Sequence, residues 1–237
     1  MLFRRISQHI GAQNWLAVML DLAIVVVGIF LGLQVSAWND TRHDRLRETE
    51  ILDHLSADFE EIKTEVDEAL DFHRGVIVAL NTVLLSLETG TVTPEEEVSV
   101  RRGLQRALWY NTGARRSDTY VDLVSSGQIR LIQNEELRSV LSKYDELHAK
   151  ANLLFAQFWE GQRSHEIVFG RHFSYETVRR RAGEMFLPGE IIAFDIAGMA
   201  ADPEFQRAVH RLIEYQVYYQ VWHATMANTA NDILALL

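Results

Sequence analysis

The sequence predicts an all-α protein, in which an N-terminal transmembrane helix continues into a long helix of an antiparallel helical bundle. Three observations lead to this fold class. An uncharged run of 18 residues extends from Leu22 to Asn39. Apolar residues then recur at alternating spacings of three and four, the pattern of a helix that packs along one face. Only three prolines occur in the 237 residues, so very long helices can form.

The run "LDLAIVVVGIFLGLQVSAWND" at residues 20–40 has three interpretations. The stretch 15–38 carries a tryptophan at each end and has the roughly 20 residues that cross a hydrocarbon core of about 30 Å, which favours a membrane anchor. A cleaved signal peptide is the second interpretation, because arginines occupy 4–5 and 35–37 is an acceptable cleavage site. The apolar run is longer than the usual signal-peptide core of about 7–15 residues. A buried core helix is the third interpretation.

Four residues of the expected span share one sector of a helical wheel. Gly28 and Gly32 form a GxxxG motif, which lets two helix backbones approach closely in lipid, and Ser36 extends it. Asp21 lies in the same sector, and an acid at mid-bilayer costs roughly 2.5–3.5 kcal/mol unless it faces protein or water. These four residues are therefore a candidate helix-packing face. The alternative is that Asp21 marks the edge of the span and that the glycines are incidental.

The sequence divides into a short tail (1–14), the transmembrane helix (15–39) and an extramembrane helical-bundle domain (40–237). The first helix of this domain carries a heptad-like apolar series that is broken only by His73. Acidic residues on its other sides indicate a solvated face. The apolar series is Leu52, Leu55, Phe59, Ile62, Val66, Ala69, Val76, Leu80, Val83 and Leu87.

Capping residues mark where the later helices begin. The sequence at 93–96, Thr-Pro-Glu-Glu, combines an N-cap, a first-turn proline and a capping box, and it predicts a helix that runs to about Tyr110. A short helix is expected to end near Gly127. A less regular region begins at Ser174, and no strong β-alternation appears. The other predicted N-caps are Ser117 or Asp118, Asn134 and Asp202.

Two segments carry a family pattern. The first pairs Asp21 with Gly-Ile at 28–29, Leu-Gln at 33–34 and Trp-Asn at 38–39, and the second is "TYVDLVSSGQIRLIQNEELRSVLSKY" at 119–144. Together they resemble a bacterial family of uncharacterised single-pass membrane proteins, whose members usually carry Glu at the position of Asp21. The motifs cover about a fifth of the chain. The resemblance implies a membrane protein and implies no activity.

Composition and motifs narrow the possible chemistry. The net charge is −10 and the pI is near 5.4, which disfavours a general nucleic-acid binder. The absence of cysteine excludes disulfides and thiolate metal sites. No P-loop, GxGxxG, HExxH or Gly-x-Ser-x-Gly motif occurs. We therefore expect no enzymatic activity, no cofactor, no metal and no identifiable small-molecule substrate.

Two groups of residues remain as candidates for binding. Tyr120, Asp122 and Ser126 are a speculative binding set, although the Ser-Ser-Gly sequence at 125–127 more plausibly closes a helix. Histidines also fall on the apolar stripes of three long helices, and the sequence leaves open whether they converge. Buried, hydrogen-bonded imidazoles are the default interpretation, and a metal site is the alternative. These histidines are His73, His148 and His223.

Three functions stay open at this level. An interaction or scaffold protein of the bacterial envelope is the expected one, with the lipid bilayer and a second copy or another membrane protein as partners. The alternative is an extracytoplasmic ligand-sensing module that acts through a partner membrane protein, and the third is a metalloprotein or enzyme. Lysine and arginine counts favour neither side of the span strongly. We expect a single-pass protein of the inner membrane with its large C-terminal domain on the periplasmic side.

Overall fold

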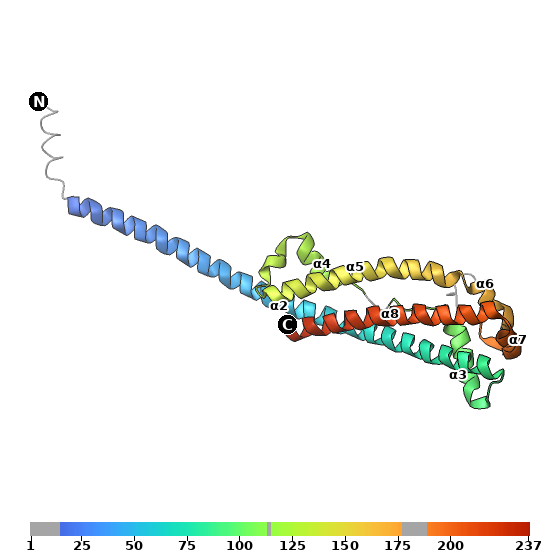
Figure 1. Cartoon of the computed structure of the whole chain (residues 1–237). Helices are drawn as coiled ribbons and strands as arrows, with labels where there is room; N and C mark the ends of the chain where they lie inside the picture. Colours follow the sequence, from blue (N-terminus) through green and yellow to red (C-terminus); the bar gives the residue numbers. More distant parts are fainter. Residues whose placement is uncertain (1–14, 113–114, 177–188) are drawn as a thin grey trace, which may run out of the picture. The chain divides into compact units, whose positions relative to one another are not determined.

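A computed structural model describes residues 15–112, 115–176 and 189–237, without the side chains of residues 15–18 and Asp21. Its elements confirm the all-α fold, with a long N-terminal helix and little sheet (Figure 1). The chain divides into two compact units, of which the first ends at Ile51 and the second is Leu52–Leu237. The helices are α2 (Trp15–Thr89), α3 (Pro94–Arg106), α4 (Asp118–Ser125), α5 (Glu135–Arg163), α6 (Glu166–Phe169), α7 (Ile196–Ala201) and α8 (Pro203–Leu236), with 3₁₀ turns η1 (Gln128–Leu131) and η2 (Gly170–His172).

Helix α2 contributes the predicted apolar series to the core of the second unit. No proline interrupts its 75 residues. Leu52 is half-buried, whereas every later member of the series is buried, and so is His73, which occupies the position where the series breaks. A heptad-like spacing places all of these side chains on one face, which explains why one stripe of a long helix is sufficient to line the core.

The predicted N-caps are present in the structure. The Thr93 hydroxyl accepts a hydrogen bond from the Glu96 amide at 3.3 Å, while the Thr93 amide donates to the Glu96 carboxylate at 3.0 Å, which is a complete capping box. Ser117 caps α4, Asn134 caps α5 and Asp202 caps α8 with their side-chain oxygens. These caps satisfy amide groups that have no partner inside the helix, and they set where each helix begins.

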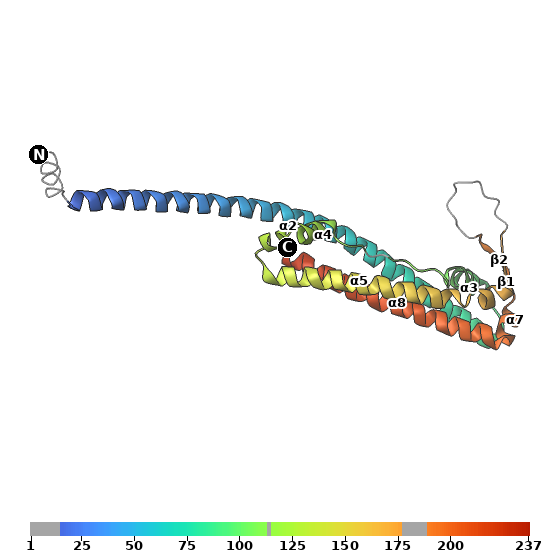
Figure 2. The same ribbon diagram turned by 90° about the horizontal axis from the view of Figure 1, so that it is seen from above.

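Helices α2, α5 and α8 form the bundle of the second unit. Helices α5 and α8 lie side by side in both views, and α8 runs antiparallel to α2 and α5 (Figures 1 and 2). Aromatic side chains fill the α5–α8 contact, with ring centroids 5.0 Å apart for Phe155 and Tyr219. The His73 ring on α2 stacks on Tyr219 at 5.1 Å, so one tyrosine contacts both neighbouring helices.

Two local expectations differ from the structure. The prediction that the second helix extends to about Tyr110 is wrong, because α3 ends at Arg106. A small antiparallel pair of strands, β1 (Phe173–Tyr175) and β2 (Ile191–Phe194), lies in the region expected to be irregular. These strands have three and four residues, too few to produce a recognisable alternation in the sequence. The residues between Glu176 and Gly189 lie outside the described part.

Candidate functional site

The apolar part of α2 in the first unit is exposed along its whole length. It is the one helix of the described residues that is long and apolar enough to cross a membrane. Its most apolar 18-residue window has a mean hydropathy of 1.9, and none of that window is buried. Leu22 is 60% exposed and Phe30 is 59% exposed. A core helix of a soluble domain would bury such side chains, so this exposure argues against the interpretation as a buried core helix.

The candidate helix-packing face is open in this structure. A Cβ atom added to Gly28 or to Gly32 would meet no atom within 4 Å, and Ser36 is exposed. The side chain of Asp21 lies outside the described residues. A shallow apolar groove of about 380 Å³ runs beside Gly28 on this helix. The groove is lined by Ala23, Ile24, Val27, Gly28 and Leu31.

The speculative binding set is only partly brought together. Asp122 and Ser126 line a polar hollow of about 490 Å³ between α2, α4 and η1, whereas Tyr120 is not among the lining residues. The carboxylate of Asp122 has no hydrogen bond or ion pair with the described residues. The hollow is lined by His54, Asp118, Thr119, Asp122, Leu123, Ser125, Ser126 and Gln128.

Asp58 of α2 holds the wall of this hollow in place. Its carboxylate accepts a hydrogen bond from the Ser117 hydroxyl at 2.7 Å and another from the Thr119 amide at 3.1 Å. Partial burial raises the pKa of Asp58, but the hydrogen bonds from Ser117 and Thr119 and the nearby Arg115 guanidinium together outweigh it, so this pKa lies below its usual value. Asp58 is therefore ionised at neutral pH and fixes α4 against α2.

The Ser-Ser-Gly sequence closes helix α4. The Ser126 hydroxyl donates to the Asp122 carbonyl at 2.7 Å, and the Ser125 hydroxyl donates to the same carbonyl at 3.0 Å. Gly127 follows with a φ of 72°, in the left-handed region that favours glycine after a helix. Both serine hydroxyls are thus used within the helix end, as the structural interpretation of this sequence expects.

Two of the three stripe histidines meet in the core. The rings of His73 and His223 stack with centroids 5.2 Å apart and planes inclined by 27°, and both side chains are fully buried. The ring of His148 instead lies 3.2 Å from the amide nitrogen of Asn152, one turn further along α5. Among the described residues no group of three or more histidine, aspartate or glutamate side chains is arranged to hold a metal ion.

The sequence did not indicate the polar groups that surround these histidines. Gln162 and Gln216 are fully buried. The Gln162 amide donates to the Ala107 carbonyl at 2.7 Å, and the Gln216 amide donates to the Trp109 carbonyl at 2.9 Å. The chain from Ala107 to Thr112 therefore contacts the interior of the bundle through its backbone. The available signal was the position of the two glutamines, each on the apolar stripe of a long helix.

Electrostatics keep this buried cluster neutral. Burial lowers the pKa of His73, although hydrogen bonds to Gln216 and the Asn111 carbonyl oppose the effect, and the neighbouring His223 lowers it further. Burial likewise lowers the pKa of His223, against hydrogen bonds to the Thr112 and Tyr219 carbonyls. Burial also raises the pKa of the Tyr219 hydroxyl. At neutral pH the site therefore contains uncharged rings.

Comparisons with family models, curated proteins and solved structures find no match to this chain. The described residues define the class of protein as a helical bundle whose first long helix, α2, carries an exposed apolar segment.

Proposed function

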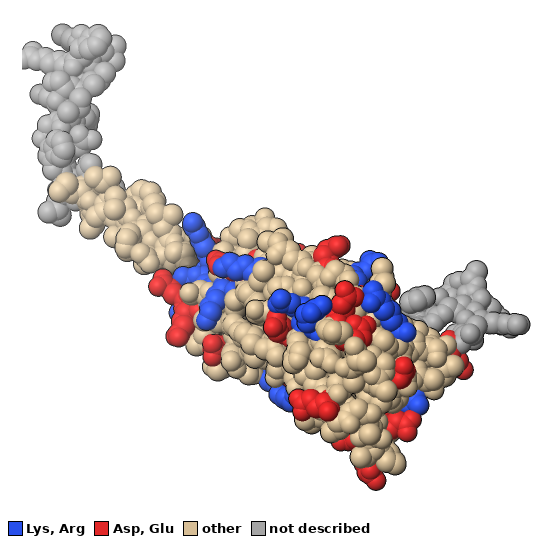
Figure 3. Space-filling view, turned by 45° about the vertical axis from the view of Figure 1, so that its right-hand side comes forward, with Lys and Arg blue, Asp and Glu red and all other residues tan. Residues whose placement is uncertain are grey.

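We propose that this chain is a membrane-anchored interaction or scaffold protein of the bacterial envelope, without catalytic activity or a cofactor. The observation that carries the proposal is the exposed apolar part of α2. An exposed apolar surface that extends over 18 residues of a helix is characteristic of a segment that contacts lipid or another protein. In Figure 3 blue and red charged residues are scattered over the visible face of the bundle, whereas most of the drawn N-terminal helix is tan.

The proposed location is the inner membrane, with a single crossing and the large C-terminal domain on the periplasmic side. A long domain translocates largely regardless of its charge, and the absence of cysteine suits an oxidising compartment. The resemblance of the span and of residues 119–144 to uncharacterised single-pass membrane proteins supports the same location. We expect alkaline phosphatase fused after Leu237 to be active. An inactive fusion in a membrane-bound chain would contradict this orientation.

The proposed partner contact is the small-residue face of the span. The absence of side chains at Gly28 and Gly32 leaves room for a second helix backbone, and lipid-exposed helices associate by such close approach. The second helix belongs to another copy of this chain or to another membrane protein. Copurification of tagged and untagged copies from native membranes separates these two possibilities.

Replacement of both glycines tests this contact. We expect the Gly28→Ile/Gly32→Ile variant to lose at least about 90% of the association signal in a membrane two-hybrid assay, because isoleucine side chains separate the helix backbones. Ala37→Ile is the matched control, since Ala37 is an exposed small residue on another side of the same helix. Unchanged association of the double variant, at an equal level in the membrane, would refute the contact.

The polar hollow supports ligand sensing as a second candidate function. Its lining combines hydroxyls with two carboxylates, of which Asp122 has no partner among the described residues. A carboxylate facing a solvent-filled hollow is suited to a ligand that carries an ammonium group. A sensor of this kind would act through a partner membrane protein.

A thermal-shift measurement with primary amines and polyamines tests the sensor. We expect a rise in the Tm of the full chain with at least one of these compounds, and loss of that rise in Asp122→Asn, which removes the charge. Asp53→Asn is the control, because Asp53 is an exposed acid of α2 outside the lining of the hollow. If no amine shifts the Tm, or if both variants respond like the original chain, the hollow is not such a site.

A further inference from the structure

The stacked pair of His73 and His223 is surrounded by hydrogen-bond acceptors. His223 Nδ1 lies 2.7 Å from the Tyr219 carbonyl oxygen, and His223 Nε2 lies 3.0 Å from the Thr112 carbonyl oxygen. His73 Nδ1 lies 2.6 Å from the side-chain oxygen of Gln216, and His73 Nε2 lies 3.1 Å from the Asn111 carbonyl oxygen. All four ring nitrogens thus face oxygen atoms.

A neutral imidazole cannot satisfy two acceptors. It carries one N–H and one bare nitrogen, so in either tautomer one nitrogen of each ring has a lone pair facing an oxygen lone pair. Both nitrogens of His223 face backbone carbonyls, whose orientation is fixed. Each ring therefore lacks one hydrogen bond that a proton would complete.

Rotation of the Gln216 amide does not remove the conflict at His73. The amide nitrogen of Gln216 donates to the Trp109 carbonyl at 2.9 Å and lies 3.3 Å from the Ala107 carbonyl. A rotated amide would present its oxygen to these two carbonyls and exchange one acceptor conflict for another. The excess of acceptors is therefore built into the packing of α2 and α8 against residues 107–112.

The groups around the pair provide no counter-ion for a protonated ring. The side chains in contact with it are the aromatic rings of Phe72 on α2, Phe155 on α5 and Tyr219 on α8. Tyr110, from the segment after α3, stacks on Tyr219. The Arg106 guanidinium, 5.8 Å from the Phe72 ring centroid, would repel the added charge. Among the described residues, no carboxylate forms a hydrogen bond or an ion pair with either histidine.

We propose that His73 and His223 form an acid-operated release for the segment Ala107–Thr112. At neutral pH the uncharged rings stack, and the Asn111 and Thr112 carbonyls cover their outer nitrogens. At acid pH, protonation of one ring completes a missing hydrogen bond. It also buries a positive charge on a ring whose centroid lies 5.2 Å from the centroid of the second ring. Separation of the Asn111–Thr112 end admits water to the charged ring. This release goes beyond the proposed membrane anchoring and does not depend on it.

The proposal determines the sign of the pH effect. Because both rings have a lower pKa in the folded chain than the ordinary 6.5, the unfolded chain binds more protons in the interval between the two values. Stability is therefore full above pH 6.5 and falls as the pH decreases through 6.5 toward the folded-state values. Asp58 and Asp202 lose their stabilising ionisation only at lower pH, since their folded-state pKa values lie below 3.8.

Hydrogen exchange of the full chain in detergent micelles tests the release without any variant. After correction for the intrinsic exchange rate, peptides covering residues 107–112 are expected to lose protection at least about tenfold between pH 7.5 and pH 5.5. Peptides covering Leu137–Tyr144 of α5 are the internal reference and should keep their protection. Equal protection of residues 107–112 at the two pH values would overturn the proposal.

A matched pair of variants isolates the histidines. The Tm of the original chain is expected to fall by about 5 °C between pH 7.5 and pH 5.5, and that of His73→Gln/His223→Gln by less than half as much. His148→Gln, a buried histidine bonded to Asn152, should keep most of the decrease. His165→Gln should remove only a smaller part of it, because burial and the nearby Arg211 also lower the pKa of this half-buried ring. If the double variant fails to fold, ring-resonance titration of the original chain decides, and a pKa of 6.5 or above for both rings refutes the proposal.

Discussion

Gln162 and Gln216 share the same two backbone acceptors. Each amide nitrogen lies within 3.5 Å of both the Ala107 carbonyl and the Trp109 carbonyl, with the shorter contact of each glutamine going to a different carbonyl. The Gln162 side-chain oxygen also accepts from the Tyr219 hydroxyl at 3.2 Å. One glutamine can therefore partly replace the other, and only the loss of both leaves two buried carbonyls without donors.

A double-mutant cycle should reveal this sharing. We expect Gln162→Leu and Gln216→Leu each to lower the free energy of unfolding by about 1–2 kcal/mol, and the double variant to lose more than the sum by about 1 kcal/mol. The measurement is chemical unfolding of the full chain in detergent, followed by circular dichroism. Strict additivity would mean that the two amides act independently and that the shared acceptors have no energetic consequence.

For single residues, the sequence predicted the face of the helix but not the contacts between helices. His73 and His223 could be assigned to apolar stripes from spacing alone, and both are buried. Their contact could not be predicted, because spacing specifies a face of one helix and not which faces meet or at what height. The hydrogen bonds of Gln162 and Gln216 could not be predicted, because their partners are backbone carbonyls, which every residue type provides and no sequence motif marks.

At the scale of elements, a glycine contact sets how closely α3 packs against α2. A Cβ added to Gly103 would lie 2.8 Å from the Ala79 carbonyl oxygen and 3.1 Å from a methyl group of Val83. The first of these is backbone, which cannot move aside without bending α2. Gly75, within α2 itself, has nothing within 4 Å of the same added atom.

Alanine at these two glycines should have opposite effects. Gly75→Ala is expected to raise the free energy of unfolding by about 0.5–1 kcal/mol, because alanine favours the helix and meets open space. Gly103→Ala is expected to lower it by about 1–3 kcal/mol, because the methyl group overpacks the α2–α3 contact. Each variant serves as the control for the other in urea titrations of the full chain. An increase in stability for Gly103→Ala would show that α3 shifts freely on α2.

Helix starts were more predictable than helix ends. Thr93, Ser117, Asn134 and Asp202 all cap helices at the expected places, because an N-cap is a local interaction of a few neighbouring residues. The carbonyls that follow the end of α3 accept hydrogen bonds from Gln162 and Gln216, which lie more than 50 residues away in the chain. Contacts with such distant side chains leave no local signal in the sequence.

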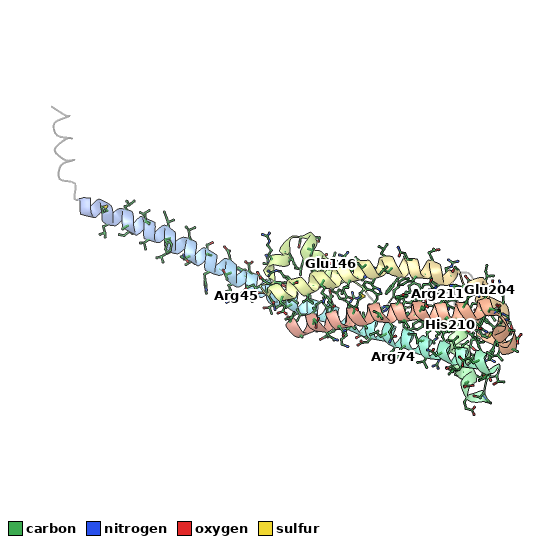
Figure 4. All side chains as sticks on the ribbon, in the orientation of Figure 1. Arg45, Arg74, Glu146, Glu204, His210 and Arg211 are labelled. Atoms are coloured by element: carbon green, nitrogen blue, oxygen red, sulfur yellow. The ribbon has the colours of Figure 1, made fainter. Side chains whose placement is uncertain are left out.

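At the scale of the whole molecule, the sequence predicted two kinds of apolar segment, one that enters the membrane and one that forms the core of the bundle. The series on α2 from Leu55 to Leu87 is buried, whereas the side chains from Leu22 to Val35 are exposed. The difference between a continuous apolar run and a heptad-like apolar stripe was sufficient to predict the all-α fold class. The charged residues could be expected on the outside, and Arg74, Glu146 and Arg211, labelled in Figure 4, are exposed. Membrane orientation and partners depend on other molecules, so the pattern of one sequence does not specify them.

The attachment of residues 107–112 by their carbonyls has a consequence for the tolerance of this chain to sequence change. A carbonyl is present whatever the side chain, so substitutions within the segment preserve the groups that hold it. The helices offer no such freedom, since His73, Gln162, Gln216 and His223 each contribute a particular nitrogen. In related chains, the restraint from these hydrogen bonds should therefore fall on four helix positions that lie far apart in sequence. Within the segment, restraint should come only from side chains that pack inward, such as Ala107 and Tyr110.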